Sequence, residues 1–141
     1  MNDHPVIKLL GDTLLTQSGS IQTNSVIEEG KYFGLYYSAQ WCPSCIAFTP
    51  ELIQFYKVQK MGKNFEIIFI SSDRSEESFV KYFSTMPWLA VPYSEEKTRK
   101  DLPHLYGVGG EILFISSTFV FLILCLICFI LVHFNVQGVY S

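Results

Sequence analysis

The sequence predicts an α/β domain in which helices cover a central sheet. Segments 31–39 and 65–70 are short, apolar and rich in aromatic or β-branched residues, which is typical of buried strands. Between them, segment 43–59 carries apolar residues mostly at spacings of three and four, the period of an amphipathic helix. A strand, a helix and a second strand in this order predict a right-handed βαβ unit with parallel strands. The 141 residues leave room for one such domain.

Two short runs of mostly apolar residues begin the chain. Residues 6–10 end at a Gly-Asp pair, and residues 13–15 are followed by the polar turn 17–20. Runs of this kind separated by turn residues predict a small N-terminal hairpin. Segment 31–39 comes next, is bounded by turn residues and is expected to form the first central strand.

The long helix and the second strand follow. The helix expected over 43–59 contains Pro50, which should kink it because proline removes one backbone hydrogen bond. Residues 61–64 then break the helical pattern. Segment 65–70 is apolar on both faces, which is typical of a central parallel strand covered by helices on either side.

Two further helices are expected after the second strand. Segment 71–75 offers an N-cap for a helix over 76–83. The extended segment 86–93 precedes a third helix over 95–106, in which Pro103 should cause an end or a bend.

The charged residues are confined to the first part of the chain, so the composition changes at Glu111. All ten basic and thirteen acidic residues lie between Asp3 and Glu111, and segment 112–141 has only His133 as a titratable side chain near pH 7. A net charge of −3 with scattered bases argues against nucleic acid, which needs a clustered cationic face. An aromatic content of 16% excludes a disordered chain. The first residues lack the regions of a secretory signal, so we expect a cytosolic location.

A long uncharged segment follows Glu111. Residues 112–134 contain no acid, lysine or arginine, and 17 of these 23 residues are Ile, Leu, Val or Phe. As a helix the segment would be about 34 Å long, enough to cross a hydrocarbon core of about 30 Å. We therefore expect a transmembrane helix that anchors the redox domain 1–111 at the cytosolic face, followed by the short polar tail 135–141. Two alternatives stay open: residues 111–116 replace an edge strand of the sheet, or the segment is an alternative terminus of a gene product that otherwise ends normally.

The motif Trp41-Cys42-Pro43-Ser44-Cys45 is the strongest chemical signal, because it lies where the first strand turns into the long helix. A sulfur at the first helical turn faces unpaired N–H groups and the positive end of the helix dipole, which stabilise a thiolate. In such sites a thiol pKa falls from about 8.5 to about 7 or lower, so Cys42 is the candidate nucleophile. Cys45 lies one turn further on the same face, within reach of a mixed disulfide at Cys42. Pro43 suits the first helical turn, and Trp41 should form an apolar wall beside the sulfur.

Other readings of the cysteines carry less weight. Cys125 and Cys128 form a second CxxC pair inside the apolar segment, with no turn before them, so we expect inert thiols. A structural zinc site would need a second pair of ligands, and His4, His104 and His133 show no ligand spacing. We therefore expect no metal, and the context of strand, CxxC and helix favours redox chemistry.

On these residues the chain resembles the thioredoxin superfamily, and within it the nucleoredoxin and tryparedoxin branch. The matching blocks, in the order and spacing of the family within residues 6–110, are Tyr36–Pro50, Phe65–Arg74, Tyr82–Tyr93 and Leu105–Val108. The resemblance implies a thioredoxin-like sheet with flanking helices and a protein-disulfide reductase, with Cys42 as nucleophile and Cys45 as resolving thiol. It also places Trp41, Pro43 and Ser44 around the dithiol. Ser44 stands where many relatives have a second proline, a difference that would tune the redox potential.

The chain departs from the family pattern after Val108. Members continue with an Ile-Pro-Thr segment whose cis-proline loop faces the CxxC motif, then with two strands and a last helix, whereas this chain has no proline after Pro103. We therefore expect the C-terminal strands and helix of the fold to be incomplete. The alternative function is a catalytically weak domain with a binding or regulatory role.

The resemblance also implies an electron source and partners. We expect no bound cofactor, because the reducing equivalents would come from an upstream NADPH-linked reductase or from a low-molecular-weight thiol. The substrates would be proteins that contain disulfides. The family makes the nucleus a second candidate location beside the cytosol.

Overall fold

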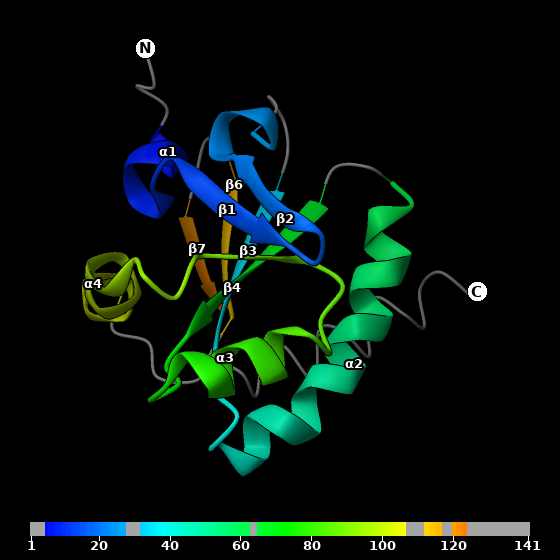
Figure 1. Ribbon diagram of the computed structural model, residues 1–141. Helices are drawn as coiled ribbons and strands as arrows, with labels where there is room; N and C mark the ends of the chain where they lie inside the picture. The colour runs from blue at the N-terminus through cyan, green and yellow to red at the C-terminus, as the bar shows by residue number, and fades with distance from the viewer. Residues whose placement is uncertain (1–4, 28–31, 63–64, 107–111, 117–119, 124–141) are drawn as a thin grey trace, which may run out of the picture.

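The computed structural model describes residues 5–27, 32–62, 65–106, 112–116 and 120–123, and its sheet lies between two layers of helices (Figure 1). The helices are α1 (Pro5–Leu10), the short 3-10 helix η1 (Thr23–Ser25), α2 (Pro43–Lys60), α3 (Glu76–Phe83) and α4 (Glu96–Tyr106). The strands are β1 (Thr13–Thr16), β2 (Gly19–Gln22), β3 (Tyr32–Ser38), β4 (Phe65–Ser71), β5 (Leu89–Ala90), β6 (Ile112–Ser116) and β7 (Val120–Ile123).

In the described chain the strands form one mixed sheet in the order β2-β1-β5-β4-β3-β6-β7. β3 and β4 are parallel neighbours joined by α2, and their register pairs Tyr32 with Phe65 and Ser38 with Ser71. β5 is parallel to β4. β1 runs antiparallel to β5, and β6 runs antiparallel to β3. The predicted unit of strand, helix and parallel strand is therefore confirmed.

Helices cover both faces of the sheet, so the central strands are almost completely buried. All seven residues of β4 are buried, and its alternate side chains enter different clusters, as the twofold period of a strand requires. Ile68 and Ile70 pack in one cluster with Leu10 of α1 and Leu102 of α4. Phe69 packs in the other cluster, with side chains of α2 and α3. Burial of each such side chain contributes about 1.5–3 kcal/mol, which holds the ends of β3 and β4 in place.

The prediction for the N-terminus is correct only in part. Residues 6–10 belong to α1 and not to a strand, and the hairpin pairs β1 with β2 across Gln17 and Ser18. Gly11 has a φ of 87°, and its N–H donates to the Ile7 carbonyl at 2.8 Å, which ends α1 with a left-handed cap. A run of five mostly apolar residues is too short for periodicity to distinguish a helix from a strand.

The three longer helices are confirmed. α2 begins at Pro43 and continues through Pro50, and its axis bends along its length (Figure 1). Ser75 caps α3 by accepting the Ser78 N–H at 3.2 Å, as the sequence predicts. α4 continues past Pro103, so that proline does not end the helix.

The prediction of a transmembrane helix over 112–134 is wrong where the structure describes this segment. Residues 112–116 form β6, antiparallel to β3, and residues 120–123 form β7, antiparallel to β6. Among the described ranges there is no helix long and apolar enough to cross a membrane. The alternative, in which this part of the segment forms a strand of the sheet, is confirmed for residues 112–116, where β6 pairs with β3 and β7 lies outside it.

The edge of β3 that β4 leaves open explains why residues 112–116 form a strand and not a membrane helix. An edge strand presents unpaired N–H and C=O groups, and β6 pairs with five residues of β3, Tyr32 to Tyr36. A run rich in Ile, Phe and Val suits a strand as well as a membrane helix, and hydropathy alone does not distinguish the two. Residues 124–141, which include the predicted tail 135–141, lie outside the described residues.

Candidate active site

Residues 39–42 connect the carboxyl end of β3 to α2, and the predicted motif 41–45 spans the end of this loop and the first turn of the helix. β3 ends at Ser38 and α2 begins at Pro43, so Cys42 is the N-cap residue, with a φ of −98° and a ψ of 107°. The Cys42 N–H donates to the Ala39 carbonyl at 3.2 Å and closes a turn that brings the sulfur to the helix N-terminus. Pro43 occupies the first helical position, where its missing N–H costs no helical hydrogen bond.

The Cys42 thiol is partly exposed and is hydrogen-bonded to its own helix. The Cys45 N–H donates to Cys42 Sγ, with 3.4 Å between nitrogen and sulfur, and Ser44 Oγ lies 3.3 Å from the same sulfur. Desolvation, the largest single influence, raises the pKa of Cys42, but the hydrogen bonds from the side chains and backbone of Cys45 and Ser44 together outweigh it. The pKa of Cys42 therefore lies below its ordinary value, which favours the thiolate.

Cys45 has the opposite character. It is only 7% exposed, and this burial, followed by the hydrogen bond to Cys42, raises the pKa of its thiol. Hydrogen bonds with Ser38 and the Ala39 backbone act in the other direction without compensating. Both cysteines are free thiols. A partly exposed thiol with a lowered pKa next to a buried thiol with a raised pKa is an arrangement suited to thiol–disulfide exchange.

Trp41 forms one wall of a cavity of about 190 Å³ that Cys42 and Cys45 also line. Its side chain is 55% exposed, and its Nε1 donates to the Ser72 carbonyl at 3.0 Å. The Arg74 guanidinium lies over the indole ring, 5.3 Å from the ring centroid. These contacts with the loop after β4 hold an exposed aromatic side chain beside Cys42.

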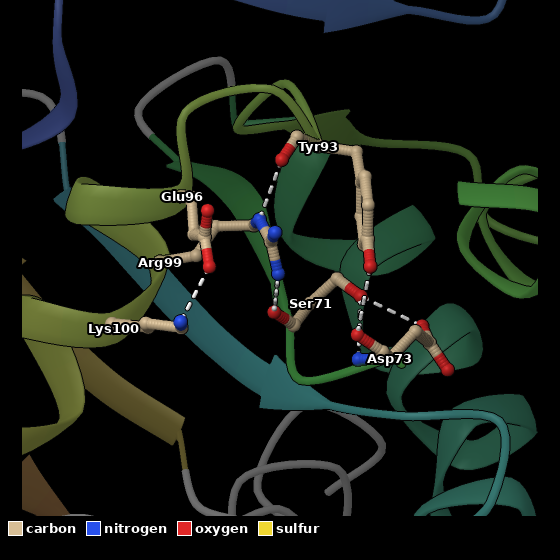
Figure 2. A network of polar contacts seen from close by, with 6 residues as sticks. All are labelled: Ser71, Asp73, Tyr93, Glu96, Arg99 and Lys100. Atoms are coloured by element: carbon tan, nitrogen blue, oxygen red, sulfur yellow. Dashed lines mark hydrogen bonds and ion pairs between the residues drawn. The ribbon is translucent and has the colours of Figure 1, made fainter. Parts of the chain in front are cut away.

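A buried carboxylate, that of Asp73, connects the loop after β4 to the motif. Its Oδ1 accepts the Gln40 N–H at 2.7 Å, and its Oδ2 accepts the Ser71 hydroxyl at 2.7 Å. The Tyr93 hydroxyl donates to the Asp73 carbonyl at 3.3 Å (Figure 2). Arg99 of α4 donates to the Ser71 carbonyl at 3.1 Å and the Tyr93 carbonyl at 2.9 Å, and it lies 3.9 Å from the Tyr93 ring centroid. The network therefore joins the loops after β3 and β4 to α4.

Sequence reasoning did not find Asp73, Tyr93 or Arg99 as members of the site. It assigns segment 71–75 only the capping of a helix. One signal was available: Asp73 follows the carboxyl end of a buried strand, and parallel strands bring their carboxyl ends to one edge of the sheet. Arg99 comes from α4, which no local pattern connects to the cysteines.

The part of the chain that the structure describes holds no group of three or more His, Cys, Asp or Glu side chains placed to bind a metal ion. His4, His133, Cys125 and Cys128 lie outside those residues.

Comparison with known proteins agrees with this geometry. A family model described as thioredoxin-like matches residues 30–125, which include the strand, the CxxC motif and the helix that follows it. The chain belongs to the thioredoxin-like family. The match also extends over β6 and β7, so both strands fall inside the thioredoxin-like region.

Individual relatives identify the branch of this thioredoxin-like chain. Nucleoredoxin from Danio rerio is 56% identical over 89 residues, which cover 62% of this chain and 21% of that protein. Tryparedoxin from Trypanosoma brucei brucei is 43% identical over 95 residues, which cover 67% of this chain and 65% of that protein. The predicted relation to nucleoredoxins and tryparedoxins is confirmed, and the chain spans about a fifth of the length of the nucleoredoxin it matches.

A solved structure confirms the thioredoxin-like fold. Tryparedoxin II complexed with glutathionylspermidine has a TM-score of 0.73 to this structure at 35% identity, and the match covers 79% of each chain. The segment after Val108, where the resemblance implies a cis-proline loop in the family, begins within residues 107–111, outside the described residues.

Proposed function

We propose that this chain is a thiol–disulfide oxidoreductase that reduces protein disulfides. The observation that carries the proposal is the difference between the two thiols. Cys42 is partly exposed at the N-terminus of α2 and has a lowered pKa, whereas Cys45 is buried one turn behind it and has a raised pKa. Membership of the thioredoxin-like family and the relation to nucleoredoxins and tryparedoxins support the same chemistry.

The reaction proceeds in two exchanges. The Cys42 thiolate attacks one sulfur of the substrate disulfide, forms a mixed disulfide and releases the other sulfur as a thiolate that takes up a proton. Cys45 then attacks Cys42 Sγ, which forms the Cys42–Cys45 disulfide and releases the second substrate thiol. The substrate gains two electrons and two protons, and the dithiol loses them. Trp41 supplies an apolar wall for the substrate, while Pro43 shapes the first helical turn and Ser44 stabilises the thiolate.

An outside donor must reduce the oxidised pair for a second turnover. We infer that the donor is an upstream NADPH-linked reductase or a low-molecular-weight thiol, and that the chain itself binds no cofactor. The complex of the related tryparedoxin II with glutathionylspermidine, a thiol of low molecular weight, supports the second source. Because the reaction starts from the dithiol, we expect it to operate in a reducing compartment, the cytosol or the nucleus.

Reduction of insulin disulfides by dithiothreitol tests the proposal. The full chain should accelerate the reaction, and Cys42→Ser should abolish the acceleration because the attacking thiolate is gone. A variant in which the second CxxC pair is changed to serine is the matched control and should retain activity. Absence of any turnover that depends on Cys42 would contradict the proposal.

A second candidate function rests on one feature of the sequence, the absence of proline after Pro103. A thioredoxin-like domain without the substrate-binding proline loop could bind partners and turn over slowly. Cys45→Ser distinguishes the two candidates, because it should trap mixed disulfides at Cys42 if the chain is a reductase. Partners that are captured equally well by Cys42→Ser would favour the binding role.

A further inference from the structure

Four hydroxyl groups form a buried, hydrogen-bonded series behind the cysteine pair, here named the hydroxyl chain: Ser38, Tyr82, Thr49 and Tyr36. Tyr82 Oη lies 2.8 Å from Ser38 Oγ and 2.7 Å from Thr49 Oγ1. Thr49 Oγ1 lies 2.8 Å from Tyr36 Oη. Thr49 Oγ1 and Tyr36 Oη also lie within hydrogen-bond distance of the Cys45 carbonyl oxygen, at 2.8 and 3.3 Å. The four residues are at most 6% exposed, so they depend on one another for hydrogen bonds.

The hydroxyl chain connects two cavities. Ser38 and Cys45 line the cavity of about 190 Å³ beside the sulfurs. Tyr82 and Thr49 line a different groove, of about 330 Å³, between α2 and α3, where Lys81 and other exposed side chains form the walls. A hydroxyl is both donor and acceptor, so a series of hydroxyls can pass a proton along its length.

The resolving step creates the need for such a path. Cys45 must lose its proton before it attacks a mixed disulfide, because the thiolate is the nucleophile. Burial raises the pKa of this thiol, so the proton does not leave readily. The buried carboxylate of Asp73 is already engaged by the Gln40 N–H and the Ser71 hydroxyl. Ser38, in contrast, lines the same cavity as Cys45, and its hydroxyl begins the hydroxyl chain.

We propose that Ser38 and Tyr82 relay the Cys45 proton to the groove between α2 and α3 during the resolving step, an inference that rests on the proposed function. Cys45 gives its proton to Ser38 Oγ while Ser38 gives its own to Tyr82 Oη. Tyr82 gives its own proton to solvent in the groove. The Cys45 sulfur forms the bond to Cys42 Sγ as the bond from Cys42 to the substrate breaks. The electron pair leaves on the substrate sulfur, which takes up a proton from solvent, and the hydroxyls end in their initial protonation state.

The aromatic disulfide DTNB separates the two steps, because it releases a coloured thiolate in each. Attack by Cys42 releases the first, and resolution by Cys45 releases the second. In the full chain, with the second CxxC pair changed to serine, Ser38→Ala and Tyr82→Phe should keep the rate of the first release. They should slow the second release by about tenfold or more. Deuterium oxide should slow the second release in the parent, and less in Tyr82→Phe, where the relayed proton no longer crosses.

Two controls separate the relay from structural damage. Tyr56→Phe removes a different buried hydroxyl, which lies about three helical turns beyond Cys45 on α2 and donates to Glu66 at 2.7 Å. It should leave both releases at the parent rate. Ser38→Thr keeps a hydroxyl and should recover the second release. If Ser38→Ala slows both releases because it disturbs the fold, Tyr82→Phe decides the question.

The outcomes distinguish the relay from the proposed function. A second release at the parent rate in Tyr82→Phe, with an unchanged solvent isotope effect, overturns the relay and leaves the proposed reductase intact. A parent chain that gives the first release without the second contradicts the proposed function itself. Slowing of the second release alone, with recovery in Ser38→Thr, supports the relay.

Discussion

Replacing Asp73 with alanine should destabilise the fold and disturb the cysteine pair at the same time. The carboxylate accepts the Gln40 N–H and the Ser71 hydroxyl, both at 2.7 Å, and Asp73 is 5% exposed. Alanine leaves both donors without their acceptor in a place that solvent reaches poorly. Because Gln40 directly precedes Trp41 and Cys42, the loosened turn should also slow alkylation of Cys42 by iodoacetamide.

The size of the effect follows from the two hydrogen bonds. A hydrogen bond to a charged group contributes about 1.5–3 kcal/mol, and the contributions of neighbouring groups are not fully additive. We therefore expect the free energy of unfolding to fall by about 3–5 kcal/mol. For a domain of this size, that change corresponds to a decrease of about 10–20 °C in melting temperature.

Urea unfolding followed by tryptophan fluorescence measures the change, because Trp88 is 1% exposed in the core. Asp101→Ala is the matched control: it removes a carboxylate from an exposed pair with Lys97, and such pairs contribute under about 1 kcal/mol. Asp73→Asn keeps an acceptor for the Gln40 N–H but loses the charge. Its loss of unfolding free energy should therefore lie between those of Asp101→Ala and Asp73→Ala. A loss below about 1 kcal/mol in Asp73→Ala would refute the reasoning.

Two further predictions concern the thiolate and the sheet edge. Ser44→Ala removes a hydroxyl that lowers the pKa of Cys42, so the pH profile of Cys42 alkylation should shift upward, toward the ordinary thiol range; an unchanged profile would show that the backbone N–H groups suffice. Removal of residues 112–141 exposes the edge of β3, so sedimentation velocity should detect self-association; a monodisperse monomer with the parent's unfolding midpoint would contradict this expectation.

Local patterns predicted the elements that depend on neighbouring residues. The strand that ends at Ser38, the helix that begins at Pro43 and the cap at Ser75 each have a signature within a few residues. Residues 6–10 were predicted wrongly in type, and for residues 112–116 the preferred membrane helix was wrong while the alternative of a strand was correct. A short or uniformly apolar run satisfies both a helix and a strand. In both places the outcome depends on what the segment packs against.

The sequence by itself located the candidate dithiol of this protein, because a thiol at the first turn of a helix owes its reactivity to the backbone and side chains next to it. Only the tertiary structure decided which distant groups support the two sulfurs. Asp73 meets Gln40 across the ends of β3 and β4, and the hydroxyl chain draws on β3, α2 and α3. It also decided that part of the uncharged segment pairs with β3. Contacts between residues far apart in the chain leave no periodicity or motif in the sequence, so they become visible only when the sheet and its helices are assembled.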